Sequence, residues 1–501
     1  MTDSPTPGRS LYARPLFLGL LPLFALWHSF NEFFGLIRLS DALFFLLYAG
    51  IWGGLLYGLC RLIFRDAVRA AAVSLFLLAV FLLFGNLYDL VLKYGHARLV
   101  TYKLFPLLLL SAAVWAGLRC ARRERAGKRA FRFLNLLLAT LLLAEGITSG
   151  IHYLDYRRHR NLIQPGTTLS DAFRPVPPPE GSPDIYLLVL DEYARADVLR
   201  KTGFDNKPFL DSLRGLGFFV ADSSRANYNF TPYAMSSCLN MDYIDPALGT
   251  NGTDTRLMMR AVRSLADNET MRILRKEGYD LQVSASLETP WQRQPTVNEF
   301  GGYSYLKLFK PTLPFRFHRD IHLPADPLLR LFPQPVNYND YAQRARDIQA
   351  HLDDTRARID SNSRRAPRFT YGHLLTTHHP FLYDSLGHLR SYRAIAADKS
   401  MSAYHNAVRV ANRDLLRLVR DIRAKGRRRS VIFLISDHGN RMDELPHDDA
   451  FRNLVAVYYP DGKPALPINV SPVNLFRDLF NRYFGQQYPL LPDSSVSVRY
   501  K

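Results

Sequence analysis

The chain has 501 residues, 48% of them hydrophobic, and a formal net charge of +19 at pH 7. This length exceeds one ordinary domain, so we expect at least two folded units, and the positive charge indicates an anionic partner. No nucleic-acid-binding motif occurs, which argues against nucleic acid as that partner. Only one of the three cysteines, Cys238, lies outside the apolar N-terminal part, so the rest of the chain cannot form an intramolecular disulfide.

Residues 1–152 are expected to form a five-span transmembrane anchor, because five apolar runs are long enough to cross a bilayer. Among the Lys and Arg residues in the short connections around these runs, twelve fall on the side of the N-terminus and four on the other side, which predicts a cytoplasmic N-terminus. Five spans then place the remainder of a bacterial chain on the periplasmic side of the inner membrane. The runs lie near residues 15–36, 43–63, 70–91, 99–118 and 131–152.

Several polar residues fall within or near these runs, among them His28, Asn31, Asp89 and Glu145. Ionisable groups inside a membrane usually face a helix bundle or a cavity. Pairing between helices and contact with a lipid headgroup are both open at this point.

Segment 153–182 is expected to be a juxtamembrane linker. Its first part, DYRRHRN, is a basic patch suited to anionic headgroups. Its second part, RPVPPPEGSP, is proline-rich and predicts a stiff, non-helical stretch that ends at a domain boundary.

Residues 183–501 are expected to form an α/β domain with a mixed, mostly parallel sheet between helices. Short apolar runs, typical of strands buried on both faces, alternate with amphipathic stretches. Ligands bind beyond the carboxyl ends of the strands in such sheets. The predicted strands are 184–190, 217–221, 279–285, 368–375, 430–435 and 453–459, and the predicted helices include 256–277, 341–360 and 402–424.

Reactive side chains follow three of the predicted strands. Asp191 and Glu192 come after the first strand, Asp437 and His438 after the fifth, and His378 in the motif HHP after the fourth. Each of these residues alone also fits a cap or a turn. Together, however, carboxylates and imidazoles at one edge of a sheet are typical of a metal site.

Thr231 adds a hydroxyl to this set. The sequence NFTPYAMSS predicts a helix with Thr231 as its N-cap and Pro232 as its first residue. Thr231 is thus either a plain cap or a nucleophile activated by a metal and by the positive end of the helix.

These motifs resemble the membrane-anchored, sulfatase-like branch of the alkaline phosphatase superfamily. That branch includes lipoteichoic acid synthases and the transferases of phosphoethanolamine and phosphoglycerol. The resemblance covers about residues 183–485, and the predicted five-span anchor matches the architecture of those enzymes.

The resemblance implies that Thr231 is the nucleophile and binds one divalent metal, Zn²⁺ or Mn²⁺, together with Asp191, Asp437 and His438. In the family a single acid occupies the place of Asp191 and Glu192. We favour Asp191 as the ligand and Glu192 as a second ligand or its support.

By the same resemblance, His378 contacts the phosphate of the substrate. His447, ten residues after Asp437, is either a further group of the site or a plain loop histidine.

The chain departs from true sulfatases at its nucleophile. No C/S-x-P-x-R motif surrounds Thr231, which argues against hydrolysis of sulfate esters. Because Cys238 is the only cysteine of residues 183–501, this domain also cannot form the disulfides usual in transferases that modify lipid A.

The expected function is metal-dependent transfer of a phosphoethanolamine or phosphoglycerol headgroup through a covalent phospho-threonine. The donor would be a membrane phospholipid, and the acceptor an envelope lipid or glycan. A hydrolase of phosphodiesters or sulfate esters and an inactive membrane scaffold are the alternatives.

Overall fold

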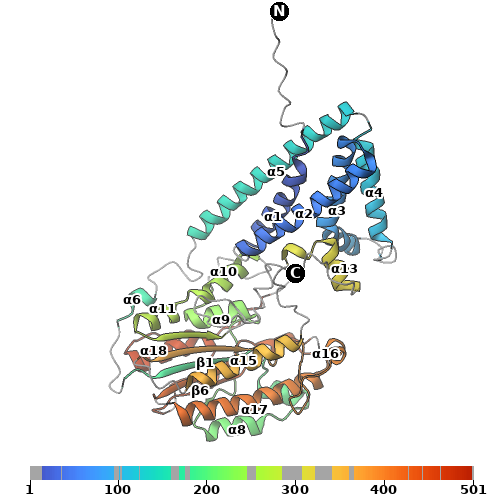
Figure 1. Ribbon diagram of the computed structural model, residues 1–501. Coiled ribbons are helices and arrows are strands. Elements are labelled where there is room, and N and C mark those ends of the chain that lie inside the picture. Colours follow the sequence, from blue (N-terminus) through green and yellow to red (C-terminus); the bar gives the residue numbers. More distant parts are fainter. Residues whose placement is uncertain are drawn as a thin grey trace, which may run out of the picture. The chain divides into compact units, whose positions relative to one another are not determined.

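The computed structural model groups the chain into two compact units (Figure 1). The helical unit comprises Met1–Arg160 and Gly302–Pro335, and the sheet unit comprises Asn161–Gly301 and Val336–Lys501. The described residues are 14–34, 37–94, 101, 104–122, 124–158, 169–174, 181–244, 255–284, 307–321, 341–359, 366–426, 428–442, 444–462 and 464–498.

These units differ from the contiguous domains expected from the sequence. Segment 302–335 groups with the helical unit, although it lies inside the stretch 183–501. The predicted linker 153–182 is also divided, because helix α5 continues to Arg158 and Phe173 is buried in the core of the sheet unit. Residues 159–168 and 175–180 of that linker lie outside the described residues.

The helical unit has one helix at each of the five apolar runs. Within the described residues, three stretches are long and apolar enough to cross a membrane, namely Leu39–Phe64, Ala67–Tyr94 and Gly127–Leu154. Helices α1 and α4 have 16 residues each, or about 24 Å, against a hydrocarbon core of about 30 Å. The count of five spans therefore stays a prediction. The helices are α1 (Phe17–Glu32), α2 (Leu39–Phe64), α3 (Ala67–Tyr94), α4 (Phe105–Cys120) and α5 (Glu124–Arg158).

Polar side chains join α1 to α5. The Nδ1 atom of His28 lies 2.8 Å from Glu145 Oε1, and Asn31 Nδ2 donates to Glu145 Oε2 at 2.6 Å. Ser149 donates its hydroxyl to Asn31 Oδ1 at 2.7 Å. Of the two roles left open for these polar residues, the structure thus shows pairing between helices.

All six predicted strands are present and form one mixed sheet in the order β2-β6-β5-β1-β4-β3. Strands β1, β3, β4 and β5 are parallel, and β6 is antiparallel to both β5 and β2. The sheet is therefore mixed and mostly parallel, as predicted. The strands are β1 (Asp184–Leu190), β2 (Phe219–Val220), β3 (Asp280–Ser284), β4 (Arg368–Leu374), β5 (Ser430–Ser436) and β6 (Val455–Tyr458).

The predicted helix 256–277 is two helices, because Asn268 interrupts it and caps the second one by accepting from Met271 N at 2.9 Å. The other two predicted helices are confirmed. The helices of the sheet unit are α6 (Leu169–Ala172), α7 (Ala196–Lys201), α8 (Lys207–Gly215), α9 (Thr231–Asn240), α10 (Thr255–Ala266), α11 (Glu269–Lys276), α15 (Tyr341–Ile359), α16 (Tyr392–Ala397), α17 (Met401–Lys425) and α18 (Leu475–Phe484), and α13 (Leu313–Ile321) belongs to the helical unit.

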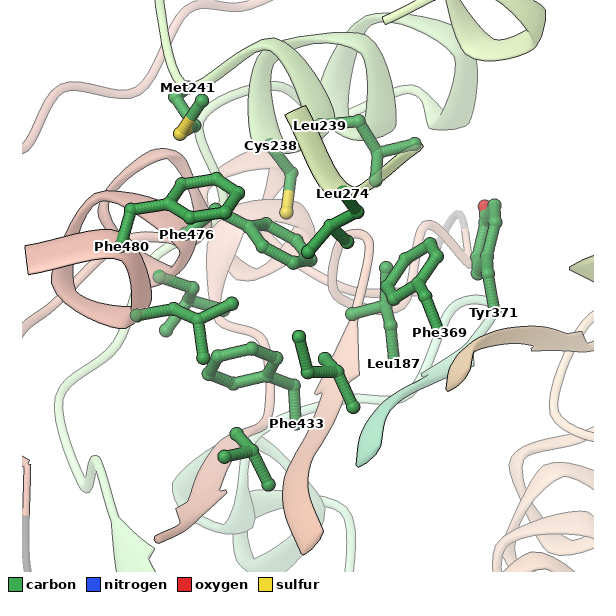
Figure 2. Packing of buried hydrophobic residues seen from close by; sticks show 14 of the residues in the cluster. Leu187, Cys238, Leu239, Met241, Leu274, Phe369, Tyr371, Phe433, Phe476 and Phe480 are labelled. Atoms are coloured by element: carbon green, nitrogen blue, oxygen red, sulfur yellow. The ribbon is translucent and has the colours of Figure 1, made fainter. Parts of the chain in front are cut away.

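Apolar side chains are buried on both faces of the sheet. Alternate residues of β1 point to opposite sides, so that Leu187 packs in one cluster and Leu188 in the other. Helices α9, α11 and α18 contribute to the first cluster, and α8, α15 and α17 to the second (Figure 1). Figure 2 shows Phe433 of β5 close to Phe476 of α18, with ring centroids 5.3 Å apart. Burial on both faces explains why β1 and β5 are apolar without interruption.

Candidate metal centre

The centre lies where β1 and β5 end side by side. Leu190 is paired with Ser436, so the residues that follow, Asp191 and Asp437, leave the same edge of the sheet. Asp191, Asp437 and His438 are buried, and their ligand atoms all lie within 4.8 Å of one another. The structure therefore brings together three of the residues expected to bind a metal.

Lone pairs converge in this cluster. His438 Nδ1 lies 2.8 Å from the carbonyl oxygen of Gly439 and donates to it, which leaves the lone pair of the neutral ring on Nε2. That Nε2 atom is 3.3 Å from Asp437 Oδ2 and 3.9 Å from Asp191 Oδ1. Among the described residues, neither carboxylate oxygen has a hydrogen-bond partner. Buried acceptors without donors are costly, and one divalent cation would satisfy both carboxylate oxygens and bind the Nε2 lone pair, so these residues fit a metal ion.

The turn after β5 requires glycine at position 439. A Cβ atom there would lie 2.2 Å from the carbonyl oxygen of Asp449 and 2.7 Å from that of Arg452. The N–H of Gly439 also donates to the carbonyl of Ala450 at 2.7 Å. This close backbone contact fixes the direction in which Asp437 and His438 leave the strand.

The two carboxyl groups have opposite pKa shifts. Burial raises the pKa of Asp191, but His378, His373 and His438 together outweigh burial and hold that pKa well below its ordinary value. Burial and the negative charge of Asp191 raise the pKa of Asp437. A cation between the two carboxylates would stabilise both in the ionised form.

His373 is a neighbour of the centre that the sequence analysis missed. It is the next-to-last residue of β4, fully buried, and its Nε2 lies 3.4 Å from Asp191 Oδ2. Its Nδ1 is 3.0 Å from the hydroxyl of Tyr371. The available signal was a histidine inside the apolar strand RFTYGHL, where an uncompensated polar residue is unusual.

Thr231 is brought into the same cluster. Its Oγ1 atom is 3.3 Å from His438 Nε2. The N-cap of α9 is Phe230, and Thr231 is the first helical residue, so the prediction of Thr231 as the N-cap was wrong by one position. The hydroxyl of Thr231 is therefore directed at the candidate metal ligands and does not cap the helix.

The start of α9 offers few donors for an anion. The N–H groups of Tyr233 and Ala234 both donate to the carbonyl of Phe230, at 3.1 and 3.0 Å, and Pro232 has no N–H. Of the first four residues, only Thr231 has an N–H that such an anion could use.

Two asparagines hold the loop that precedes Thr231. The Asn227 side chain donates to Ser471 Oγ at 2.9 Å and accepts from Val473 N at 2.9 Å. The Asn229 side chain accepts from Val498 N at 2.7 Å. The motif NYNF thus ties this loop to C-terminal segments distant in sequence, which positions the hydroxyl of Thr231.

Glu192 lies beside the centre, but its side chain is bound elsewhere. Its backbone has φ of +60°, and its N–H donates to Asp437 Oδ1 at 3.2 Å. Its carboxylate accepts from Arg441 Nε at 2.7 Å. Burial raises the pKa of Glu192, but His378 and Arg441 together outweigh burial and lower that pKa. Within the described part of the chain, the ligand cluster contains Asp191 and not Glu192. The sequence analysis did not single out Arg441.

The two remaining predicted residues differ in their surroundings. His378 is half-buried, its Nδ1 lies 3.2 Å from Arg344 NH2, and it contributes to the lowered pKa of Asp191 and of Glu192. His447 is exposed, and its Nε2 lies 3.3 Å from Ser497 Oγ. Among the described residues, no hydrogen bond or ion pair joins His447 to the ligand cluster.

Solved structures of phosphoethanolamine transferases are among those similar to the chain. The C-terminal periplasmic domain of EptC from Escherichia coli is 13% identical, covers 63% of this chain and 87% of that chain, and has a TM-score of 0.37. The integral membrane lipooligosaccharide phosphoethanolamine transferase A from Neisseria meningitidis is 15% identical, covers 88% of both chains and has a TM-score of 0.37.

No curated protein matches the chain in sequence. Residues 244–471, however, match the Sulfatase family model. This stretch contains His378, Asp437 and His438, whereas Asp191 and Thr231 precede it. Over residues 244–471 the match confirms the sulfatase-like family that the motifs resemble.

Proposed function

We propose that the chain is a metal-dependent transferase that moves a phosphoethanolamine or phosphoglycerol headgroup from a phospholipid to an envelope lipid or glycan. One observation carries this proposal. The hydroxyl of Thr231 lies 3.3 Å from His438 Nε2, within a buried set of carboxylate and imidazole ligands. A hydroxyl in that position is activated as a nucleophile.

Asp191, Asp437, His438 and Thr231 would hold the cation, Zn²⁺ or Mn²⁺. When bound, such a cation stabilises an ionised hydroxyl and polarises a phosphoryl oxygen. His438 keeps its Nε2 unprotonated by donating from Nδ1 to the carbonyl of Gly439.

Two displacements complete the reaction. Thr231 Oγ1 loses its proton and attacks phosphorus, the bond from phosphorus to the diacylglycerol oxygen breaks, and diacylglycerol leaves after taking a proton. The headgroup is then bound to Thr231 as a phosphodiester. An acceptor hydroxyl attacks the same phosphorus, gives up its proton, and releases Thr231, which is protonated again.

The charges near the centre support an anionic substrate. Arg441 and Arg344 lie around it, Glu192 is paired with Arg441, and a divalent cation would offset the carboxylates of Asp191 and Asp437. A phosphodiester would complement these cations. Threonine cannot become the formylglycine that sulfatases use, which favours a phosphoryl group over a sulfuryl group.

A labelled phospholipid tests this function. Phospholipid carrying a radiolabelled headgroup, supplied in mixed micelles with an envelope acceptor, should give labelled acceptor and free diacylglycerol, and a chelator should abolish both products. Release of sulfate from an aryl sulfate without any diacylglycerol would instead identify a sulfate ester hydrolase. The absence of turnover with either substrate would identify an inactive scaffold.

We further propose that the sheet unit lies on the periplasmic side of a bacterial inner membrane. Twelve Lys and Arg residues on the side of the N-terminus, against four on the other side, favour a cytoplasmic N-terminus. Five spans then place the chain that follows them on the opposite side of the membrane. A reporter that matures only in the periplasm should therefore be active when fused after Lys501. Activity of a cytoplasm-dependent reporter at the same position would contradict this topology.

A further inference from the structure

One segment of the C-terminal part of the sequence packs into the helical unit. We call the described residues 307–321, which end in α13, the return segment. Its apolar anchor is Phe309, which is fully buried. The Phe309 ring lies 5.3, 5.4 and 5.3 Å from the rings of Phe44, Phe45 and Tyr48 of α2. Contacts of this kind are typical of a protein core.

Polar contacts connect the return segment to α3. Arg316 is only 3% exposed, forms an ion pair with Asp89, and donates to the carbonyl of Gly85 at 3.1 Å. Its guanidinium also lies 5.8 Å from the centre of the Tyr88 ring. In the opposite direction, Gly85 N donates to the carbonyl of Pro311 at 2.7 Å. A buried guanidinium satisfied in this way requires one defined position of the segment on α3.

Gly85 is required for this contact. A Cβ atom at that position would lie 2.7 Å from Arg316 Nε, 2.8 Å from the carbonyl oxygen of Lys310 and 3.0 Å from Pro311 Cα. Two of these three atoms belong to the backbone and cannot move without displacing the segment. By contrast, a Cβ atom at Gly54 of α2 would meet nothing within 4 Å.

The place of the return segment in the chain connects it with the candidate centre. It follows β3, whose carboxyl end lies at the same edge of the sheet as Asp191, because β3, β4 and β1 are parallel. It precedes α15, in which Arg344 contacts His378. Because 302–335 belongs to the helical unit, the chain passes between the two units three times, at 160/161, 301/302 and 335/336.

We propose that the return segment is a docking element that anchors the chain between β3 and α15 in the helical unit, as a second tether of the centre to the part of the chain held in the membrane, so that the centre acts on a donor in that membrane. Gly85 and Arg316 are positioning residues for that reaction, because a chain that passes three times between the units leaves the centre fewer orientations than a single connection would. This inference rests on the proposed function where it concerns the lipid donor.

The test compares Gly85→Leu with the matched control Gly54→Leu in the full-length protein. We expect Gly85→Leu to lower kcat/KM for labelled phospholipid in vesicles by about tenfold or more. Hydrolysis of a soluble substrate, bis(p-nitrophenyl) phosphate, should stay within about twofold of the parent protein, because the centre itself is unchanged. Gly54→Leu should match the parent with both substrates. Arg316→Gln removes the ion pair with Asp89 and the bond to the carbonyl of Gly85. It should therefore also lower turnover of the phospholipid and leave hydrolysis of the soluble diester within about twofold of the parent protein.

A second measurement does not depend on activity. Trypsin should cleave after Arg316 slowly in the parent protein and in Gly54→Leu, and much faster in Gly85→Leu. Faster cleavage without a selective loss of lipid turnover would overturn the positioning role, as would an equal loss with both substrates. Unchanged cleavage would overturn docking itself. If the parent protein hydrolyses the soluble diester but never uses the lipid, the proposed function fails, and cleavage still decides whether the segment docks.

Discussion

Replacing Thr231 with alanine should lower turnover of the lipid donor by about three orders of magnitude or more, while the protein still folds. The reason is chemical, because alanine removes the only hydroxyl seen against His438 Nε2 in the described residues and leaves phosphorus without its nucleophile. The helix should remain, because the cap of α9 is Phe230 and the Thr231 side chain makes no capping bond. Turnover is measured as diacylglycerol released, and folding as the thermal unfolding midpoint.

Thr231→Ser is the matched control. It keeps the hydroxyl and loses one methyl group, so it should retain measurable turnover. Mass spectrometry of the parent protein quenched after mixing with donor should locate the headgroup on the peptide that contains Thr231. Parent-like turnover in Thr231→Ala, or a headgroup found on another residue, would rule out the proposed nucleophile.

Removing one candidate ligand should abolish metal binding. Asp191→Asn, Asp437→Asn and His438→Ala each remove one of three ligand atoms that lie within 4.8 Å of one another. Loss of a group that only supports a metal ligand typically lowers metal affinity by about 10- to 100-fold. Loss of a ligand itself leaves the site incomplete, so each variant should lose about a hundredfold or more in metal affinity. Metal content is measured by elemental analysis of purified protein, and affinity by competition with a chelator.

Two further variants are controls for this experiment. His447→Ala should keep the metal, because His447 is exposed and contacts Ser497. Glu192→Gln should also keep it, because the carboxylate of Glu192 is bound by Arg441 and lies outside the ligand cluster. If Glu192→Gln loses the metal and Asp191→Asn retains it, the ligand would be Glu192, and the assignment of the centre would be wrong.

Much of the sheet unit could be predicted from local pattern. The strands β1 and β5 are buried on both faces, so they are apolar without interruption, and a reader of the sequence can find their ends within a residue or two. Because parallel strands end at one edge of a sheet, the pairing of Asp191 with Asp437 and His438 followed from the order of the elements. The predicted strand 217–221 is only two residues long in the structure, Phe219–Val220, and this difference does not affect the site.

Other features depend on contacts between residues far apart in the chain. Asp191 and Glu192 are adjacent and chemically alike, and only the backbone at Glu192, with φ of +60°, together with its ion pair to Arg441, separates their surroundings. His373 is recognisable in the sequence only as a polar residue of an apolar strand, and its contact with Asp191 arises once β4 is paired with β1. Such distinctions need the folded chain.

The sequence by itself therefore determined the strands, the helices at the apolar runs and the residue types at the strand ends, because periodicity and turn chemistry are local. Tertiary structure alone decided which acid joins the ligand cluster, that Thr231 faces His438, and that His447 lies with Ser497. It also decided that 302–335 joins the helical unit. The physical reason is the same in each case, since burial, ion pairs and close backbone approach such as that at Gly85 arise between segments that the sequence keeps apart.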